Sequence, residues 1–330
     1  MRVLVLGGAG YIGSVVAAHL ERAGHEITVA DNLSTGNAWA LSPAVRFVPV
    51  DVTDRAGLDQ VIRNGYDAVL HFAGLSLAGA SVRDPLGYLR ANTSGAFNLL
   101  EAMRAHGIRR LVYSSTAAVY GDPGPDPVDE SAPTRPTTPY GASKLAAEQA
   151  ICFETEARGI GAVILRPFNV AGSHGALGEW HHPETHLIPL ALQAAAGVRP
   201  VIPILGTDFP TPDGTGVRDF LHVSDLAQAN VLALEATAEA GIKVCNISTG
   251  IGSSVRQIIE LAGTVTGRPV PTSETPRRAR DAAVVVGSPA RAWRELGWKP
   301  SRTARDSVAD TWAWMQLHLP ASVVGAAAAG

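Results

Sequence analysis

The sequence predicts an α/β protein built on a doubly wound parallel sheet, followed by a smaller mixed α/β domain. Two observations support this fold class. Short and almost wholly apolar runs alternate with helical patterns through the first half of the 330-residue chain, and strands this apolar are typical of parallel sheets covered by helices on both faces. In addition, a glycine-rich turn joins the first strand directly to the first helix, as in nucleotide-binding sheets.

The first half contains six predicted strands and three clear helices. The strands are expected at residues 2–6, 26–30, 45–50, 68–72, 110–115 and 162–166. The helices are expected at residues 11–23, 85–106 and 139–158. Because parallel strands are joined by right-handed crossovers, these elements should form one sheet with helices on both faces.

The pattern becomes less regular after residue 167. We expect a loop over 171–185, a helix over 187–197, a strand over 201–205, turn and loop over 210–219, a strand over 220–223, and helices over 224–237 and 303–318. These patterns predict a first domain over 1–168 and a second over 169–320, with the segment at about 219–248 crossing back to the first. The low-complexity segment 321–330 is predicted to be a flexible tail.

The composition excludes several classes of protein. A net charge of −3 gives no bulk attraction to nucleic acid or to an anionic membrane. Cys152, in a helical pattern, and Cys245, in a strand-like run, do not form a disulfide framework. The chain enters a strand at once, without a signal peptide, and no apolar run reaches the roughly 18 residues that span a bilayer. We therefore expect a soluble, cytoplasmic protein.

The glycine-rich turn has the form G-x-x-G-x-x-G, with Gly7, Gly10 and Gly13. Glycines let the backbone turn sharply and approach a pyrophosphate, and the helix that follows offers free N–H groups and a favourable dipole. Asp31 ends the second strand, where a carboxylate can accept hydrogen bonds from both adenosine ribose hydroxyls and repel a 2′-phosphate. This arrangement favours NAD over NADP, although a tight structural turn with a capping Asp is the alternative.

Two further strand ends extend this prediction. Asp51 and Val52 follow the third strand, where an acid lies close to the adenine amino group, although capping of the next helix explains Asp51 nearly as well. The fourth strand runs into HFAG, residues 71–74. Small side chains there would let a cofactor lie against the backbone in the crevice of the sheet.

The stretch TTPYGASK contains Tyr140 and Lys144, which share one face of a helix because they are four residues apart. Tyr-x-x-x-Lys alone is a weak pattern, and on its own it more often marks a plain helix surface. Here the helix follows a strand that ends in Ser114, Ser115 and Thr116, whose hydroxyls should face the same crevice. A phenol has a pKa near 10, but a neighbouring ammonium favours the phenolate, so Tyr140 is a candidate base for a reaction that transfers hydride.

With these motifs in order, the chain resembles the extended short-chain dehydrogenase/reductase family, whose nucleotide-binding part is a Rossmann-type sheet. More narrowly, it is similar to the UDP-glucose (UDP-galactose) 4-epimerases of that family. The resemblance runs from residue 2 to about 318 and is most specific in GGAGYIGS (7–14), DNLSTG (31–36), PYGASK (139–144) and PTPDGTGVRDFLHV (210–223).

The resemblance implies a role for each matching residue. The implied catalytic residues are Thr116, Tyr140 and Lys144. The implied contacts of NAD are Gly7, Gly10, Tyr11, Ile12, Gly13, Asp31, Asn32, Leu33, Ser34, Thr35, Gly36, Asp51, Val52, Phe72, Ala73, Gly74, Asn92, Tyr140, Lys144 and Phe168. The implied contacts of the UDP-sugar are Thr116, Asn169, His186, Leu187, Pro203, Ile204, Leu205, Arg218, Arg278, Asp281 and Val285. Guanidinium groups suit a diphosphate, but RRARD (277–281) alone reads as a solvated charge run.

The resemblance also implies a reaction. Tyr140 takes the proton of the sugar 4-hydroxyl while hydride moves from C4 to NAD, and the hydride then returns to the opposite face of a 4-keto sugar. Related dehydratases and decarboxylases carry an acid shortly after the hydroxyl residue, whereas Ala117 and Ala118 follow Thr116 here. A non-catalytic NAD sensor typically lacks the tyrosine or the lysine, and both are present.

Four positions depart from the family pattern. Thr116 stands where many relatives have Ser, Ser76 where some have Lys, and Pro167 where an aromatic residue is usual. Val285 occupies a position where, by resemblance, a bulky tyrosine accompanies plain hexoses and a smaller residue leaves room for a 2-N-acetyl group. UDP-N-acetylhexosamines therefore remain an alternative substrate.

Two further predictions concern metals and assembly. His181, His182 and His186 cluster in a predicted loop, but no cysteine pair or His-Glu-x-x-His helix accompanies them, so no metal site is expected. The resemblance implies a homodimer formed by the helices around 85–106 and 139–158. The candidate interface residues, which equally suit packing on the protein's own sheet, are Leu99, Leu100, Met103, Ile151 and Phe153.

Overall fold

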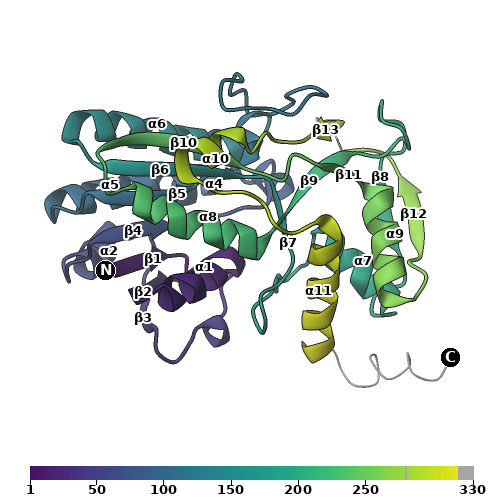
Figure 1. Cartoon of the computed structure of the whole chain (residues 1–330), viewed down its shortest axis with the longest axis horizontal. Coiled ribbons are helices and arrows are strands. Elements are labelled where there is room, and N and C mark those ends of the chain that lie inside the picture. The colour runs from purple at the N-terminus through teal and green to yellow at the C-terminus, as the bar shows by residue number, and fades with distance from the viewer. Residues whose placement is uncertain (279–280, 319–330) are drawn as a thin grey trace.

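A computed structural model describes residues 1–278 and 281–318 and confirms the predicted α/β fold (Figure 1). Its main sheet has seven strands, all parallel. They are β1 (Arg2–Leu6), β2 (Glu26–Asp31), β3 (Arg46–Pro49), β4 (Ala68–His71), β5 (Arg110–Ser114), β6 (Gly161–Pro167) and β10 (Gly241–Ile247). All six strands predicted in the first half are present, within a residue or two of their predicted ends.

The strand order is β10-β6-β5-β4-β1-β2-β3. The chain adds β2 and β3 on one side of β1 and then adds β4 on the other side, so the strand order reverses between β1 and β4. Leu6 at the end of β1 is in register with Ala30 of β2 and with His71 of β4. The carboxyl ends of these strands therefore lie level with one another. Ligands of doubly wound sheets bind at this reversal, outside the carboxyl ends of the strands.

Helices cover both faces of the seven-stranded sheet. On one face lie α1 (Tyr11–Arg22), α8 (Val223–Ala236) and α10 (Ala290–Leu296), whose apolar side chains join a core cluster with those of β1 and β6. On the other face lie α2 (Arg55–Ile62), α5 (Gly95–Ala105) and α6 (Pro139–Arg158), with a second cluster beneath them. Burial on both faces explains why the strands are apolar throughout rather than alternating.

The rest of the chain forms a smaller α/β unit beside the edge of the sheet (Figure 1). One small sheet contains β7 (Asn169–Ala171), β9 (Val217–His222), β11 (Gly252–Ser254) and β13 (Val284–Val285), and another pairs β8 (Ile202–Leu205) with β12 (Thr272–Thr275). Three helices, α7 (Leu187–Ala195), α9 (Val255–Thr266) and α11 (Ala304–His318), pack around a shared apolar cluster. The segment between β9 and β11, with α8 and β10, returns to the large sheet, as does α10.

Several short elements connect these layers. They are the single turns α3 (Ala78–Ser81) and α4 (Pro85–Tyr88), the π-helical stretch η2 (Leu89–Ser94), and the 3₁₀ turns η1 (Ala38–Ala40) and η3 (Ala117–Val119). The predicted helix over 85–106 is thus made of α4, η2 and α5 in succession. The predicted helix over 139–158 agrees with α6 at both ends, because Thr138 caps its start and Gly159 adopts a left-handed conformation at its end.

The sequence prediction was wrong in one place and incomplete in another. Residues 217–219, predicted as loop, begin strand β9, because Val217 and Arg218 pair with β11 on one side and β13 on the other. The sequence patterns also predict no element between 248 and 302, where α9, α10 and three short strands occur. The tail, 321–330, lies outside the described residues.

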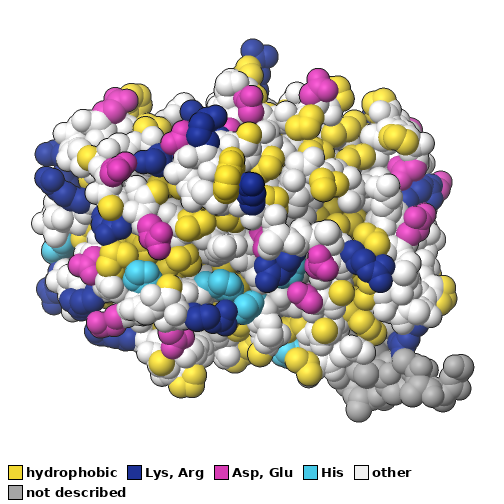
Figure 2. Space-filling view, viewed as in Figure 1, with side chains coloured by type: hydrophobic (Ala, Val, Ile, Leu, Met, Phe, Trp, Pro, Cys, Tyr) yellow, Lys and Arg dark blue, Asp and Glu magenta, His cyan; other side chains and the backbone are white. Residues whose placement is uncertain are grey.

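The surface and the cysteines agree with the composition. On the face shown in Figure 2, positive and negative side chains are interspersed and form no block of one sign. Cys152 and Cys245 are both free thiols. Among the helices of the described residues, none is long and apolar enough to cross a membrane.

Candidate active site

A cleft of about 530 Å³ opens at the carboxyl edge of the large sheet, at the reversal between β1 and β4. It collects the loops that follow β1, β2, β3, β4 and β5, together with the start of α6 and part of the segment between β7 and α7. The predicted cofactor and catalytic residues that line it are Gly7, Gly10, Tyr11, Ile12, Gly13, Asp31, Asn32, Ser34, Thr35, Asp51, Val52, Phe72, Ala73, Gly74, Thr116, Tyr140, Lys144 and Phe168. Sequence reasoning therefore found most of one wall of this cleft.

Three residues predicted to contact NAD lie outside the lining. Leu33 is exposed with a positive φ of 57°, and Gly36 packs against the backbone of Ala9. Asn92 is buried; its side chain accepts a hydrogen bond of 2.8 Å from the Leu75 backbone N–H and donates one of 2.9 Å to the Ser143 hydroxyl. Asn92 thus fastens the loop after β4 to helix α6 rather than facing the cleft.

The glycine turn is packed so closely against neighbouring backbone that side chains would not fit at two of its glycines. Gly7 has a φ of +75°, and a Cβ there would lie 2.4 Å from the backbone nitrogen of Ala73. A Cβ at Gly13 would lie 2.2 Å from the Gly7 carbonyl oxygen. No side chain caps the start of α1, and its first turn has no acidic residue. The unpaired N–H groups of that turn can therefore receive a pyrophosphate, as the sequence predicts.

Two carboxylates lie at the other end of the cleft. Each oxygen of the buried Asp31 accepts one backbone N–H, from Ala9 at 3.0 Å and from Leu33 at 2.8 Å, which fixes its orientation. Asp51 accepts from the Asn32 side chain at 2.8 Å and from Thr53, whose hydroxyl is the largest of the causes that lower the pKa of Asp51. Asp54, not Asp51, caps helix α2. The helix-capping interpretation of Asp51 is therefore wrong.

Tyr140 and Lys144 face the cleft from the first turns of α6. Burial raises the pKa of Tyr140, and the Thr116 hydroxyl partly opposes this effect. Burial lowers the pKa of Lys144 to about 8, while the Glu148 carboxylate acts in the opposite direction. The Lys144 ammonium donates a 2.7 Å hydrogen bond to the carbonyl of Ser114 at the end of β5. The structure thus brings together the three residues predicted to be catalytic.

A buried ion pair below this group was missed by the sequence analysis. Arg166 of β6 donates two hydrogen bonds to Glu148 of α6, at 3.0 and 2.6 Å, and the Ser115 hydroxyl also donates to Glu148. Both side chains of the pair are less than a tenth exposed. Glu148 lies four residues after Lys144, so the pair fixes the part of α6 that carries the lysine. The sequence signal that could have revealed this ion pair is Arg166 itself, a charged residue in an otherwise apolar strand.

His71 was also missed, although it stands in the HFAG motif. Its ring is buried at the end of β4, 5.5 Å from the ring of Tyr113, and neither ring nitrogen has a hydrogen-bond partner among the described residues. Burial, with a smaller contribution from the Lys144 charge, lowers the pKa of His71 to about 3. A neutral imidazole therefore lies close to the Lys144 ammonium.

Only some of the residues predicted to contact the UDP-sugar line the cleft. Thr116, Asn169 and His186 line the cleft, whereas the others do not: Leu187, Pro203, Ile204, Leu205, Arg218, Arg278, Asp281 and Val285. Arg218 donates a 2.5 Å hydrogen bond to Asp281, which joins two residues assigned to neighbouring parts of the nucleotide. Val285 packs against an apolar cluster that contains Phe168, a residue of the cleft wall.

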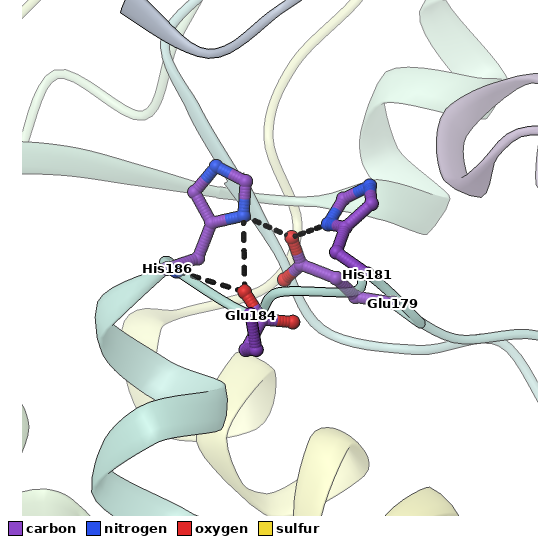
Figure 3. A group of neighbouring side chains, drawn as sticks. All are labelled: Glu179, His181, Glu184 and His186. Atoms are coloured by element: carbon purple, nitrogen blue, oxygen red, sulfur yellow. Dashed lines mark hydrogen bonds and ion pairs between the residues drawn. The ribbon is translucent and has the colours of Figure 1, made fainter. Parts of the chain in front are cut away.

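A compact group of four side chains includes three that line the cleft (Figure 3). Glu179, His181, Glu184 and His186 come from the irregular segment between β7 and α7, and their ligating atoms all lie within 4.8 Å of one another. Although burial opposes the charged forms, the Glu179 carboxylate raises the pKa of His186, and the His186 charge lowers the pKa of Glu179. Tyr11 lies near this group. Burial raises the pKa of its phenol, and the Glu179 charge raises it further.

Comparison with known proteins agrees with this geometry. The family described as NAD dependent epimerase/dehydratase matches residues 3–248. A UDP-glucose 4-epimerase of Streptomyces lividans is 49% identical, over 96% of this chain and 97% of its own length.

Among solved structures, a UDP-glucose-4-epimerase from Stenotrophomonas maltophila, with bound NAD and formylated UDP-arabinopyranose, is 40% identical. The alignment covers 96% of this chain and 98% of the Stenotrophomonas chain, with a TM-score of 0.92. A UDP-Glc/GlcNAc 4-epimerase from Campylobacter jejuni is 35% identical. The alignment covers 96% of this chain and 99% of the Campylobacter chain, with a TM-score of 0.84.

Proposed function

The chain belongs to the NAD dependent epimerase/dehydratase family, and from this premise we propose that it interconverts UDP-galactose and UDP-glucose by inverting C4 of the sugar. The observation that carries the proposal is the placement of Thr116, Tyr140 and Lys144 on one wall of a cleft built for a dinucleotide. Relatives named UDP-glucose 4-epimerase match nearly the whole chain, which supports the same substrate class.

The residues present fit NAD. Three features recur in dinucleotide sites, and all are here: a glycine turn whose Cβ positions are closed by backbone, an uncapped helix start, and an oriented carboxylate at Asp31. When bound, NAD supplies a reversible hydride acceptor, so that C4 of the sugar can be oxidised and then reduced from the opposite face. No net redox change results.

Tyr140 is the proposed base. Its phenol takes the proton of the 4-hydroxyl as C4 is oxidised, and gives it back when the 4-keto sugar is reduced. Thr116 lies beside it and shares the hydrogen bonds of the same sugar oxygen. The buried Lys144 ammonium favours the phenolate electrostatically, and its hydrogen bond to the Ser114 carbonyl holds it in place.

We propose that residues 1–168 hold the cofactor and that residues 169–320 hold the UDP-sugar. Asn169 and His186 on the cleft wall support this division, because they come from the second part of the chain. Arg218 and Arg278 would neutralise the diphosphate, and Asp281 would bind the uridine ribose while paired with Arg218. Leu187 would join them at the sugar, with Pro203, Ile204 and Leu205 bordering the uracil.

The alternative substrate is a UDP-N-acetylhexosamine, and one observation favours it. Val285 packs in the cluster that contains Phe168, next to the expected position of the sugar. A valine at this position leaves more room than a tyrosine would. A relative named for both UDP-Glc and GlcNAc aligns with nearly the whole chain.

We further propose a homodimer in the cytoplasm. Of the five candidate interface residues, Leu99, Leu100, Met103 and Ile151 pack in the chain's own core. Phe153 on α6 is 70% exposed, and Phe97 on α5 is 45% exposed. Two exposed phenylalanines on adjacent helices support an interface formed by α5 and α6.

The experiment for the proposed activity uses the purified full-length protein without added NAD. UDP-galactose and UDP-N-acetylgalactosamine are incubated separately, and the products are resolved by chromatography. We expect UDP-galactose to be converted to UDP-glucose, and the ratio of the two rates to report the room beside Val285. If neither substrate is converted, even with NAD supplied, the proposal is wrong and the dehydratase alternative must be tested.

A further inference from the structure

The group formed by Glu179, His181, Glu184 and His186 takes no part in the proposed reaction, apart from the sugar contact assigned to His186. All four residues come from one irregular segment of the chain. In Figure 3, the Nδ1 atoms of both histidines turn toward the two carboxylates, while the second ring nitrogen of each points away. We call these four residues the His–Glu cluster.

Two imidazole nitrogens converge on a single carboxylate oxygen in this cluster. The Oε1 atom of Glu179 lies 3.0 Å from Nδ1 of His181 and even closer to Nδ1 of His186. Glu184 approaches the same His186 nitrogen to 3.5 Å. A carboxylate that bridges two histidines in this way is more crowded than a simple ion pair requires.

Ion pairs hold Glu179 to both histidines, but their hydrogen-bond geometry is poor. Both Nδ1 atoms are shielded from solvent, and neither makes a hydrogen bond of acceptable geometry with any described residue. The side chain of Glu179 is only 4% exposed. Buried polar atoms that converge without satisfying one another usually have another partner, such as a bound ion.

We propose that the His–Glu cluster binds one divalent transition-metal cation, with Zn²⁺ as the best match. Two imidazole nitrogens and two carboxylate oxygens are a donor set that zinc accepts, with bonds of about 2.0–2.2 Å in a tetrahedral arrangement. Tetrahedral bonds of that length separate the donors by roughly 3.4 Å, which fits atoms that all lie within 4.8 Å of one another. Imidazole donors favour zinc over calcium or magnesium.

This inference departs from the sequence prediction, which expected no metal. That prediction considered the three histidines at 181, 182 and 186 without Glu179 and Glu184. The spacing Glu-x-His-x-x-Glu-x-His belongs to no regular helix or strand, so its convergence is visible only after folding. His182 is exposed and stands outside the cluster.

The site would act by positioning rather than by chemistry on the sugar. Glu179, His181 and His186 line the same cleft as Tyr140, so a bound cation would hold this part of the segment between β7 and α7 in the cleft lining. Through Nδ1, the cation would also hold the His186 ring and leave its second nitrogen directed away from the metal. Close packing of Gly178 against Trp314 of α11 already holds the start of this segment.

The test uses the full-length protein without a histidine tag. The protein is stripped with a chelator, equilibrated with Zn²⁺, desalted and analysed for metal by mass spectrometry. We expect about one zinc per chain, lost in His181→Gln and Glu179→Gln and kept in the matched control His182→Gln. Absence of zinc from the wild-type protein, or equal retention in His181→Gln, would overturn the proposal.

A second measurement uses only the wild-type protein, so its result does not depend on whether the variants fold. The stripped wild-type protein is titrated with Co²⁺, whose visible absorption is intense in a tetrahedral site and weak in six-coordinate, water-rich sites. We expect an intense band that saturates at about one equivalent and is abolished by Zn²⁺. A weak spectrum only, as for adventitious cobalt on surface histidines, would count against the site. Neither readout depends on the epimerase activity.

Discussion

At the scale of single residues, the surroundings of Tyr140 support its proposed role as the base. It lies in the first turn of α6, on the cleft wall with Thr116, and burial raises its pKa. The ammonium of Lys144, four residues later, is fixed by the Ser114 carbonyl. The protein therefore supplies a neutral phenol beside an ordered cation, and the cofactor charge adds to the cation when NAD is bound.

Replacing Tyr140 by Phe should remove the base and leave the cleft intact. We expect kcat for the epimerisation to fall by about 10²–10⁴, with little change in the amount of NAD that the protein retains. The matched control is Tyr88→Phe, since the Tyr88 ring lies 6.3 Å from that of Tyr140 but its hydroxyl donates to the Leu77 carbonyl. Equal losses in both variants would show that packing, rather than proton transfer, is responsible.

His71 makes a second residue-scale prediction, about pH. Its pKa is about 3 in the folded chain and about 6.5 when unfolded. Between these values the unfolded chain binds more protons, so the free energy of unfolding falls as the pH is lowered through that window. Between pH 7.5 and pH 5, His71 should lower the free energy of unfolding by about 2 kcal/mol.

His71→Phe keeps the ring and removes both buried nitrogens. We expect the variant to lose less stability than the wild type between pH 7.5 and pH 5, as measured by urea denaturation at both values. Identical losses in the two proteins would mean that the His71 ring is hydrated or protonated in the folded state.

At the scale of elements, helix α6 connects Tyr140 and Lys144, the residues proposed to be catalytic, to the sheet. Thr138 caps its first turn, Tyr140 and Lys144 face the cleft, and Glu148 binds Arg166 of β6 one turn further on. Asn92 of η2 joins the same helix to the loop after β4 through the Ser143 hydroxyl. The position of the reactive side chains thus depends on polar contacts buried between elements.

Breaking the buried pair should destabilise the whole fold. Glu148→Gln leaves the Arg166 guanidinium without its charge partner in a buried site, at a cost of about 3–5 kcal/mol in the free energy of unfolding. The control on the same helix is Glu154→Gln, whose partner Arg104 is half exposed and whose loss should cost about 1 kcal/mol or less. Guanidinium denaturation of the three proteins checks this ranking, and equal midpoints would contradict it.

At the scale of the whole molecule, the exposed phenylalanines of α5 and α6 bear on assembly. If Phe97 and Phe153 lie in a dimer interface, a charge at Phe153 should separate the subunits. We expect the wild-type protein to have the mass of a dimer by light scattering after gel filtration, and Phe153→Asp that of a monomer. A monomeric wild-type protein would rule out this interface.

Much of the fold could be predicted from the sequence because its signals are local. The apolar strands, the glycine turn and the pair Tyr140–Lys144 each depend on residues close together in the chain, and the structure places them as expected. The start of β9 at Val217 could not be predicted, because its pairing partners lie in β11 and β13. The contact of Glu148 with Arg166 and the convergence of Glu179 with His186 also exist only after folding.

The most direct test of the central proposal follows the hydrogen at C4 of the sugar. UDP-galactose deuterated at C4 is converted by the holoprotein in ordinary water, and the product is analysed by NMR. The account predicts UDP-glucose that keeps the deuterium at C4, because the hydride leaves and returns within one closed cleft. Deuterium lost to solvent, or found at another carbon of the sugar, would contradict the account.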